Sequence, residues 1–153
     1  KKRLNDGEEM VEKTKKEGAK VLLGGKRPSG FNKGFYYEPT IFDEVKDDYT
    51  IMKVEPFGPL VPILSFKSFD EIIERANNND LGLCSYICTN SMEKAHRASE
   101  LMESGTVAVN TPLVALAEAP FGGIKQTGYG REGGSMAIKD YLNIKYTHLG
   151  LKG

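Results

Sequence analysis

The pattern of apolar and polar positions predicts an alternation of short strands and helices along the whole chain. Four apolar runs, at residues 20–23, 61–66, 85–89 and 105–110, have the length and side-chain types of strands. The run at 61–66 is apolar at nearly every position, which indicates a strand buried on both faces of a parallel sheet. Residues 47–52 have the length of a single helical turn.

Three segments begin with residue pairs spaced as capping boxes, which predicts a helix after each pair. The pairs are Asn5 with Glu8, Ser68 with Glu71, and Asn90 with Glu93. The first helix is expected to end near Glu17. Apolar spacing predicts the inner faces of the other two helices, namely Phe69, Ile72, Ile73 and Ala76, then Met92, Ala95, Ser99 and Met102.

This order of elements predicts an α/β fold: an open, mostly parallel sheet with flanking helices. Residues 35–45 contain Pro39, so we expect an edge strand or two short extended pieces there. Residues 141–151 are expected to form a long terminal strand, which needs a partner edge in its own sheet or in another subunit. We therefore divide the chain into an α/β domain at residues 1–139 and a terminal strand at residues 140–153.

Composition mainly excludes classes of partner. The 153 residues are 39% hydrophobic and 27% charged, as in one globular domain with a core. There are 21 basic and 21 acidic residues, so no net charge recruits nucleic acid or an anionic membrane. No apolar stretch reaches the roughly 18 residues of a membrane helix, and the N-terminus lacks a signal-peptide pattern. We expect a soluble, cytoplasmic protein.

The cysteines and histidines do not form a catalytic or metal-binding pattern. Cys84 and Cys88 lie four residues apart, on one face of a predicted strand, and two thiols are too few for a structural zinc site. We interpret both as buried structural thiols. His96 and His148 have no ligand-like neighbours in the sequence, and we expect them to be structural or surface residues.

The glycine-rich stretch at residues 120–134, PFGGIKQTGYGREGG, is the main candidate for a functional loop. Gly128 to Gly133 satisfies the dinucleotide-binding pattern G-x-G-x-x-G, but no strand directly precedes it and no acidic residue follows at the required distance. The phosphate-loop pattern also fails, because its Lys and hydroxyl residue are missing. A structural loop, in which the glycines adopt positive φ and Arg131 pairs with Glu132, is the remaining interpretation.

Five segments, in order along the chain, resemble motifs of the aldehyde dehydrogenase superfamily. The stretch from Pro120 to Gly133 is similar to the C-terminal signature PFGGxKxSGxGRExG, with Thr127 in the usual Ser place. Glu55 to Pro59, EPFGP, is similar to the family motif ExFGP. The other three segments are GFYYEPT at 34–40, LGL at 81–83 and GTVAVN at 105–110.

The resemblance implies that the chain is the C-terminal part of a larger enzyme. Members of this family oxidise an aldehyde to a carboxylate with NAD or NADP, using a nucleophilic cysteine and a general-base glutamate. Both of those residues lie upstream of the region matched here, and Cys84 and Cys88 do not match the nucleophile motif. We therefore assign no catalytic residue to this chain. Residue 1 is Lys rather than Met, which also suggests a piece of a longer protein.

The same resemblance implies four site residues. Glu55 would accept hydrogen bonds from the nicotinamide ribose, and Phe57 would pack beside the nicotinamide. Phe121 would line the substrate tunnel, next to a loop at residues 112–119 that sets substrate preference. Ala115 stands where the succinate-semialdehyde branch has a serine that binds the distal carboxylate, so the resemblance gives less support to a dicarboxylic semialdehyde as substrate. In the opposite direction, residues 141–151 resemble the C-terminal strand of that same branch. We expect a small aldehyde as substrate, with semialdehydes as the leading class.

The resemblance further implies that residues 141–151 join the sheet of a neighbouring subunit in a homo-oligomer. Two functions remain open: part of an NAD(P)-dependent aldehyde dehydrogenase, or a non-catalytic binding or assembly module with the same fold. A reactive Cys and a Glu in an upstream segment would distinguish them. In either case we expect the 153-residue chain alone to be inactive.

Overall fold

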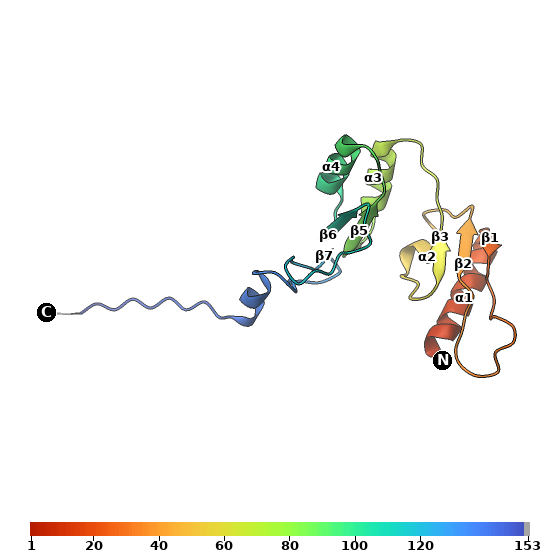
Figure 1. The fold of residues 1–153 in the computed structure, drawn as a ribbon, viewed down its shortest axis with the longest axis horizontal. Helices are drawn as coiled ribbons and strands as arrows, with labels where there is room; N and C mark the ends of the chain where they lie inside the picture. Colours follow the sequence, from red (N-terminus) through yellow and green to blue (C-terminus); the bar gives the residue numbers. More distant parts are fainter. Residues whose placement is uncertain (152–153) are drawn as a thin grey trace. The chain divides into compact units, whose positions relative to one another are not determined.

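A computed structural model describes residues 1–151, which divide into two compact units at Glu71 and Ile72. The first unit contains α1 (Lys2–Glu17), β1 (Lys20–Leu23), β2 (Thr40–Asp43), α2 (Thr50–Lys53) and β3 (Leu60–Pro62). The second contains β4 (Leu81–Gly82), β5 (Cys84–Ile87), α4 (Met92–Leu101), β6 (Thr106–Val109), β7 (Ile124–Lys125) and a 3-10 helix, η1 (Ala137–Tyr141). Helix α3 (Phe69–Asn77) spans the boundary (Figure 1).

The first unit is a three-stranded sheet packed against α1 and α2. Its strand order is β1-β2-β3, with β1 antiparallel and β3 parallel to β2. The core holds seven buried residues, Val11, Ala19, Phe42, Val45, Tyr49, Ile51 and Leu60, of which Val11 and Phe42 are fully buried. The loop after β1, at residues 24–39, and the loop before β3, at residues 54–59, are coloured orange and yellow in Figure 1 and contribute no residue to this core.

Helix α1 begins at Lys2, three residues before the predicted Asn5, and no side chain caps its N-terminus. The expected capping box does not form, because Asn5 lies inside the helix and its N–H donates to the Lys1 carbonyl at 3.2 Å. The Glu8 carboxylate instead accepts two hydrogen bonds from the guanidinium of Arg27. That pair connects α1 to the loop after β1, 19 residues further along the chain.

The carboxylate of Glu17, at the end of α1, caps α2. One oxygen accepts from the Thr50 backbone N–H at 3.0 Å and the other from the Thr50 hydroxyl at 2.6 Å. The Thr50 hydroxyl hydrogen bond lowers the pKa of Glu17 below its ordinary value. Because α2 leads directly into residues 54–59, this contact fixes the starting point of the segment that contains Glu55.

The sheet organisation differs from the expected single open sheet. Three separate sheets are present among residues 1–151: the β1-β2-β3 sheet, an antiparallel β4-β7 pair and a parallel β5-β6 pair. The segment expected to be an edge strand forms β2, the middle strand of the first sheet. Pro39 lies just before β2 and not within it, so its missing N–H costs no ladder hydrogen bond.

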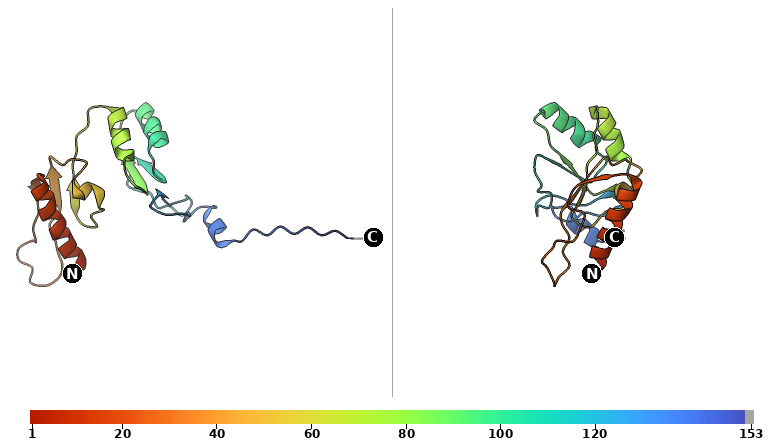
Figure 2. Two further views of the ribbon diagram at one scale, coloured as in Figure 1. Left: turned by 180° about the vertical axis from the view of Figure 1, so that it is seen from behind. Right: turned by 90° about the vertical axis from the view of Figure 1, so that its right-hand side faces the viewer.

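In the second unit, α3 and α4 lie beside each other next to the β5-β6 pair (Figure 2). The predicted cap of α3 is confirmed, since the Ser68 hydroxyl accepts from the Glu71 N–H at 3.2 Å and a Glu71 oxygen accepts from the Lys67 N–H at 2.8 Å. The cap of α4 lies one residue later than predicted. Ser91, and not Asn90, accepts from the Lys94 N–H at 3.3 Å.

Several residues expected in the core are exposed. Helix α4 buries Ala98, whereas Met92 is 82% exposed and Ser99 is also exposed. Val61 in β3 is 51% exposed, and Cys88 is exposed although Cys84 is half-buried. The predicted inner face of α4 is therefore wrong in part, because the one buried residue, Ala98, was not among the predicted positions. Residues 1–151 also leave Val61 and Cys88 uncovered.

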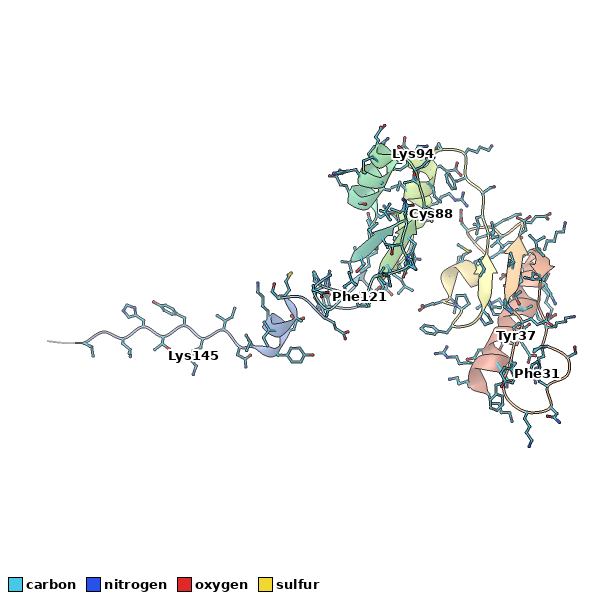
Figure 3. All side chains as sticks on the ribbon, viewed as in Figure 1. Phe31, Tyr37, Cys88, Lys94, Phe121 and Lys145 are labelled. Carbon is cyan, nitrogen blue, oxygen red and sulfur yellow. The ribbon has the colours of Figure 1, made fainter. Side chains whose placement is uncertain are left out.

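The expected terminal strand at 141–151 is not formed within the described chain. After η1, residues Leu142–Leu151 have no assigned secondary structure, and all of them are exposed. Ile144 and Leu151 are 101% and 94% exposed, and Figure 3 draws their neighbour Lys145 with its side chain projecting from the backbone. Residues 152–153 of the predicted segment lie outside the described residues. A strand requires a partner edge, and none is supplied here.

No helix within residues 1–151 combines the length and the apolar character needed to cross a lipid bilayer.

Candidate functional site

Residues 54–59 form a stiff, exposed turn between α2 and β3, which we call the Glu55 segment. The Gly58 N–H donates to the Pro56 carbonyl at 2.7 Å, and the Pro59 carbonyl accepts from the Thr40 N–H at 2.8 Å. The second bond lies at the start of the parallel β2-β3 ladder. The segment is thus held at both ends, by α2 and by the sheet, while its middle faces solvent.

Glu55 and Phe57 are both presented to solvent on this segment. Glu55 is exposed, and its carboxylate has no hydrogen-bond or ion-pair partner among residues 1–151. Phe57 is 66% exposed, which is unusual for a large aromatic side chain. The guanidinium carbon of Arg3, from the first turn of α1, lies 4.9 Å from the centre of the Phe57 ring. The Glu55 segment therefore presents an exposed acceptor and, two residues later, an exposed ring with a cation over it.

The other predicted pair, Phe121 and Ala115, belongs to the second unit. Phe121 and Glu132 exchange two backbone hydrogen bonds of 2.7 Å, which closes the glycine-rich loop into a hairpin-like bridge. Phe121 is half-buried, and Figure 3 shows it close to the end of the second unit that carries η1. Ala115 is exposed, in the middle of residues 112–119. We call these residues the substrate loop, after the role that the family resemblance led us to expect.

The glycine-rich loop holds the far end of the substrate loop. The Gly134 N–H donates to the Ala117 carbonyl at 2.8 Å. A Cβ at Gly133 would lie 2.5 Å from the Ala119 carbonyl oxygen, and Gly133 has a φ of +70°. No other residue fits this conformation and this close approach. The substrate loop is consequently anchored while Leu113 and Leu116 remain 69% and 50% exposed.

Asn110 fixes the near end of the substrate loop. It adopts a left-handed conformation, with φ of 55°, immediately after β6. Its side-chain amide donates to the Thr89 carbonyl at 2.8 Å and accepts from the Thr89 N–H at 2.9 Å, so it extends the β5-β6 pairing by one step. The substrate loop therefore leaves the sheet from a defined point and in a defined direction.

Two residues of the signature connect the glycine-rich loop to the rest of the second unit. The Thr127 hydroxyl accepts from the Gly82 N–H at 2.8 Å, which links the loop to β4. The ammonium of Lys125 donates to the carbonyls of Asn77 and Asn79 at 2.7 and 3.0 Å and pairs with Glu103. A cation at the C-terminal end of α3 also suits the helix dipole.

Arg131 acts on the loop backbone and not on Glu132. Its guanidinium donates to the carbonyls of Gly123 and Gly130 at 2.9 and 2.7 Å, and its N–H donates to Asp140 at 2.9 Å. The expected pairing with Glu132 is therefore wrong. No helix begins in or directly after the G-x-G-x-x-G stretch, as the dinucleotide-binding pattern would require.

Both cysteines and both histidines are at least partly exposed. Both cysteines are free thiols, and the expectation that Cys88 is buried is wrong. His96 lies on the surface, 3.5 Å from Glu100. The hydroxyl of Tyr146 lies 3.2 Å from His148, which is also exposed. Among residues 1–151, no cluster of three or more His, Cys, Asp or Glu side chains could hold a metal ion.

Sequence reasoning identified the exposed segments but not the contacts that position them. It missed Asn110 and Thr127 because their partners, Thr89 and Gly82, are distant in sequence. It also missed Arg3, because the contact of Arg3 with Phe57 joins residues 54 positions apart.

Residues 1–147 match the model of the aldehyde dehydrogenase family, so the chain belongs to that family. It is 45% identical to retinaldehyde dehydrogenase 3 of Homo sapiens over 137 residues, which cover 90% of this chain and 26% of that protein. Retinal dehydrogenase 2 of Mus musculus is 45% identical over 145 residues, covering 95% of this chain and 28% of that protein.

Solved structures give the same result. An NAD+ complex of aldehyde dehydrogenase from Bacillus cereus has a TM-score of 0.94 at 42% identity, and covers 99% of this chain and 30% of its own. Succinate-semialdehyde dehydrogenase from Burkholderia pseudomallei has a TM-score of 0.90 at 37% identity, and covers 96% and 30%. The chain thus has the α/β fold of this family and spans about 26–30% of the length of these relatives.

We predict that Thr127→Val lowers the free energy of unfolding of the second unit by about 1–3 kcal/mol, because it leaves the Gly82 N–H without an acceptor. Thr127→Ser keeps the hydroxyl and should cost less. Denaturant unfolding monitored by circular dichroism measures both variants. Equal losses for Val and Ser would show that the hydrogen bond does not carry the effect.

Proposed function

We propose that this chain is the C-terminal part of an NAD(P)-dependent aldehyde dehydrogenase that oxidises an aldehyde to a carboxylate. The observation that carries the proposal is the exposed Glu55 carboxylate, which has no partner among residues 1–151, two positions before the exposed Phe57, within a family match over residues 1–147. The chain would provide the nicotinamide-ribose site and part of the substrate tunnel. The nucleophilic cysteine and the general base would come from an upstream segment.

The Glu55 segment fits the nicotinamide half of a dinucleotide. An ionised carboxylate is an acceptor-only group, and two ribose hydroxyls are two donors. Hydrogen bonds to a charged acceptor are stronger than neutral ones. The Phe57 ring offers an apolar surface to the nicotinamide ring, and its exposure leaves room for it. Two similar solved structures support this assignment: the NAD+ complex of the Bacillus cereus aldehyde dehydrogenase, and 3,6-anhydro-L-galactose dehydrogenase in complex with NAP.

The bound nicotinamide supplies the hydride acceptor for aldehyde oxidation. The residues of this chain contribute orientation. Glu55 fixes the ribose, Phe57 limits where the nicotinamide can lie, and the rigid turn between α2 and β3 keeps both side chains in place. A displacement of about 1 Å between reacting groups can cost roughly a hundredfold in rate, so this orientation is a substantial contribution.

We propose that the substrate is an aldehyde whose far end is uncharged. The side chains of Leu113, Ala115 and Leu116 in the substrate loop are exposed to solvent. The only charged residue of this loop is Glu118. A carboxylate at the far end of a semialdehyde would find no cation in this loop and would be repelled by Glu118. The semialdehyde interpretation keeps two supports, the likeness of the chain to the Burkholderia pseudomallei succinate-semialdehyde dehydrogenase and the resemblance of residues 141–151 to that branch.

We also propose that residues 141–151 pair with the sheet of a second subunit. This segment carries five exposed large apolar or aromatic side chains besides Tyr141, namely Leu142, Ile144, Tyr146, Leu149 and Leu151. Exposed apolar surface of this extent on one segment is typical of an interaction site. Backbone groups of an unpaired extended segment would also be satisfied by adding it to a sheet edge.

In the full-length protein, Glu55→Leu should lower the rate of hydride transfer by about a hundredfold while leaving the fold intact, because the ribose loses its acceptor. The test is a primary deuterium isotope effect with a deuterated aldehyde, alongside thermal unfolding. Glu55→Gln keeps one carbonyl acceptor, so its rate of hydride transfer should lie between that of the unaltered protein and that of Glu55→Leu. An unchanged hydride-transfer rate in Glu55→Leu would remove the assigned role.

Ala115→Ser should raise kcat/KM for succinate semialdehyde by about tenfold relative to an uncharged aldehyde of similar length, because a hydroxyl donor can bind the far carboxylate. Ala115→Val changes the size of the side chain without adding a donor and is the matched control. Steady-state kinetics with both aldehydes provide the measurement. A wild-type preference for the semialdehyde would contradict the proposed uncharged substrate.

A proline in the 141–151 segment should weaken the oligomer if the segment adds to a sheet, because proline removes a ladder N–H. Along a strand, every second N–H group faces the partner strand. Of the two variants Tyr146→Pro and Thr147→Pro, one should therefore dissociate the oligomer and the other should weaken it less. Analytical ultracentrifugation of the full-length protein measures this, with Thr147→Ser as control. Unchanged association in both proline variants would exclude the pairing.

A further inference from the structure

The strongest unassigned feature of the first unit is the position of Arg3. Its guanidinium carbon lies 4.9 Å from the centre of the Phe57 ring, within the range of a cation–π interaction. No other hydrogen bond or ion pair of Arg3 is found among residues 1–151. Its charge is therefore not neutralised by a carboxylate of the described chain, and its N–H donors are available.

The contact with Phe57 is the one interaction of the Arg3 side chain that is found among residues 1–151. It joins the start of the described α1 to the turn between α2 and β3, 54 residues further along the chain.

We infer that Arg3 is a positioning residue of the nicotinamide site, and that it sets the preference of the site between oxidised and reduced cofactor. This inference rests on the proposed function, since it takes Phe57 as the ring beside the nicotinamide. Arg3 holds one face of the Phe57 ring and leaves the remaining ring surface for the cofactor. The ring is 66% exposed with Arg3 in place, so the two do not exclude each other.

The consequence for cofactor binding follows from charge. The nicotinamide ring carries a positive charge in NAD+ and none in NADH. A guanidinium on the neighbouring aromatic ring raises the free energy of the bound cationic form and leaves that of the neutral form nearly unchanged. Arg3 therefore shifts the site toward the reduced cofactor. The shift weakens as salt is added, because part of the interaction crosses solvent.

The test compares dissociation constants of NAD+ and NADH for the full-length protein by titration calorimetry at low ionic strength, with NADP+ and NADPH as a second pair. Arg3→Gln should raise the ratio of the NADH constant to the NAD+ constant by roughly threefold, and 0.5 M salt should reduce that difference. Arg3→Lys retains the charge and should leave the ratio within a factor of two of the unaltered protein.

Lys2→Gln is the matched control, because it removes the same charge from the same helix turn at a side chain that has no recorded contact with Phe57. Its ratio should not change. An unchanged ratio in Arg3→Gln, or an equal change in Lys2→Gln, would overturn the inference while leaving the dinucleotide site intact. Failure of the unaltered protein to bind any of the four dinucleotides would instead overturn the proposed function, and the inference with it.

Discussion

Close backbone approach at glycine positions is the constraint on which the second unit depends. A Cβ at Gly105, just before β6, would lie 1.8 Å from the carbonyl oxygen of Gly122 in the glycine-rich loop. A Cβ at Gly133 would lie 2.5 Å from the Ala119 carbonyl oxygen. Side chains at these positions would force the glycine-rich loop away from β6 and from the substrate loop. The geometry around Phe121 therefore depends on two places where no side chain can be accommodated.

In the first unit, the position of the functional segment depends on a carboxylate. Glu17 connects the end of α1 to the start of α2 through Thr50, and α2 leads into the turn that presents Glu55 and Phe57. The same helix α1 contributes Arg3 to the Phe57 ring. One helix thus determines both where the turn begins and which cation accompanies its aromatic ring. The exposed side chains of this turn are positioned by contacts that are themselves remote from it.

The exposed apolar faces are consistent with the limited share of its relatives' length that this chain covers. The chain spans about 26–30% of the length of its relatives, so faces such as that of Val61 and Met92 need not be covered by its own residues. An apolar run indicates only that a face is to be buried. Whether residues 1–151 provide the cover is a property of the tertiary structure, and here they do not.

The sequence alone determined the family, the α/β fold class and the positions of most helices and strands. It could do so because capping at Ser68, strand runs such as 105–110 and the motifs at 55–59 and 120–133 are local patterns. Only the tertiary structure decided that Glu8 pairs with Arg27 and does not cap α1, and that β2 is a central strand. It also decided that Thr127 binds Gly82 and that Arg3 covers Phe57. These contacts join residues from 19 to 54 positions apart, and their energies depend on which distant groups the fold brings together, which no local pattern encodes.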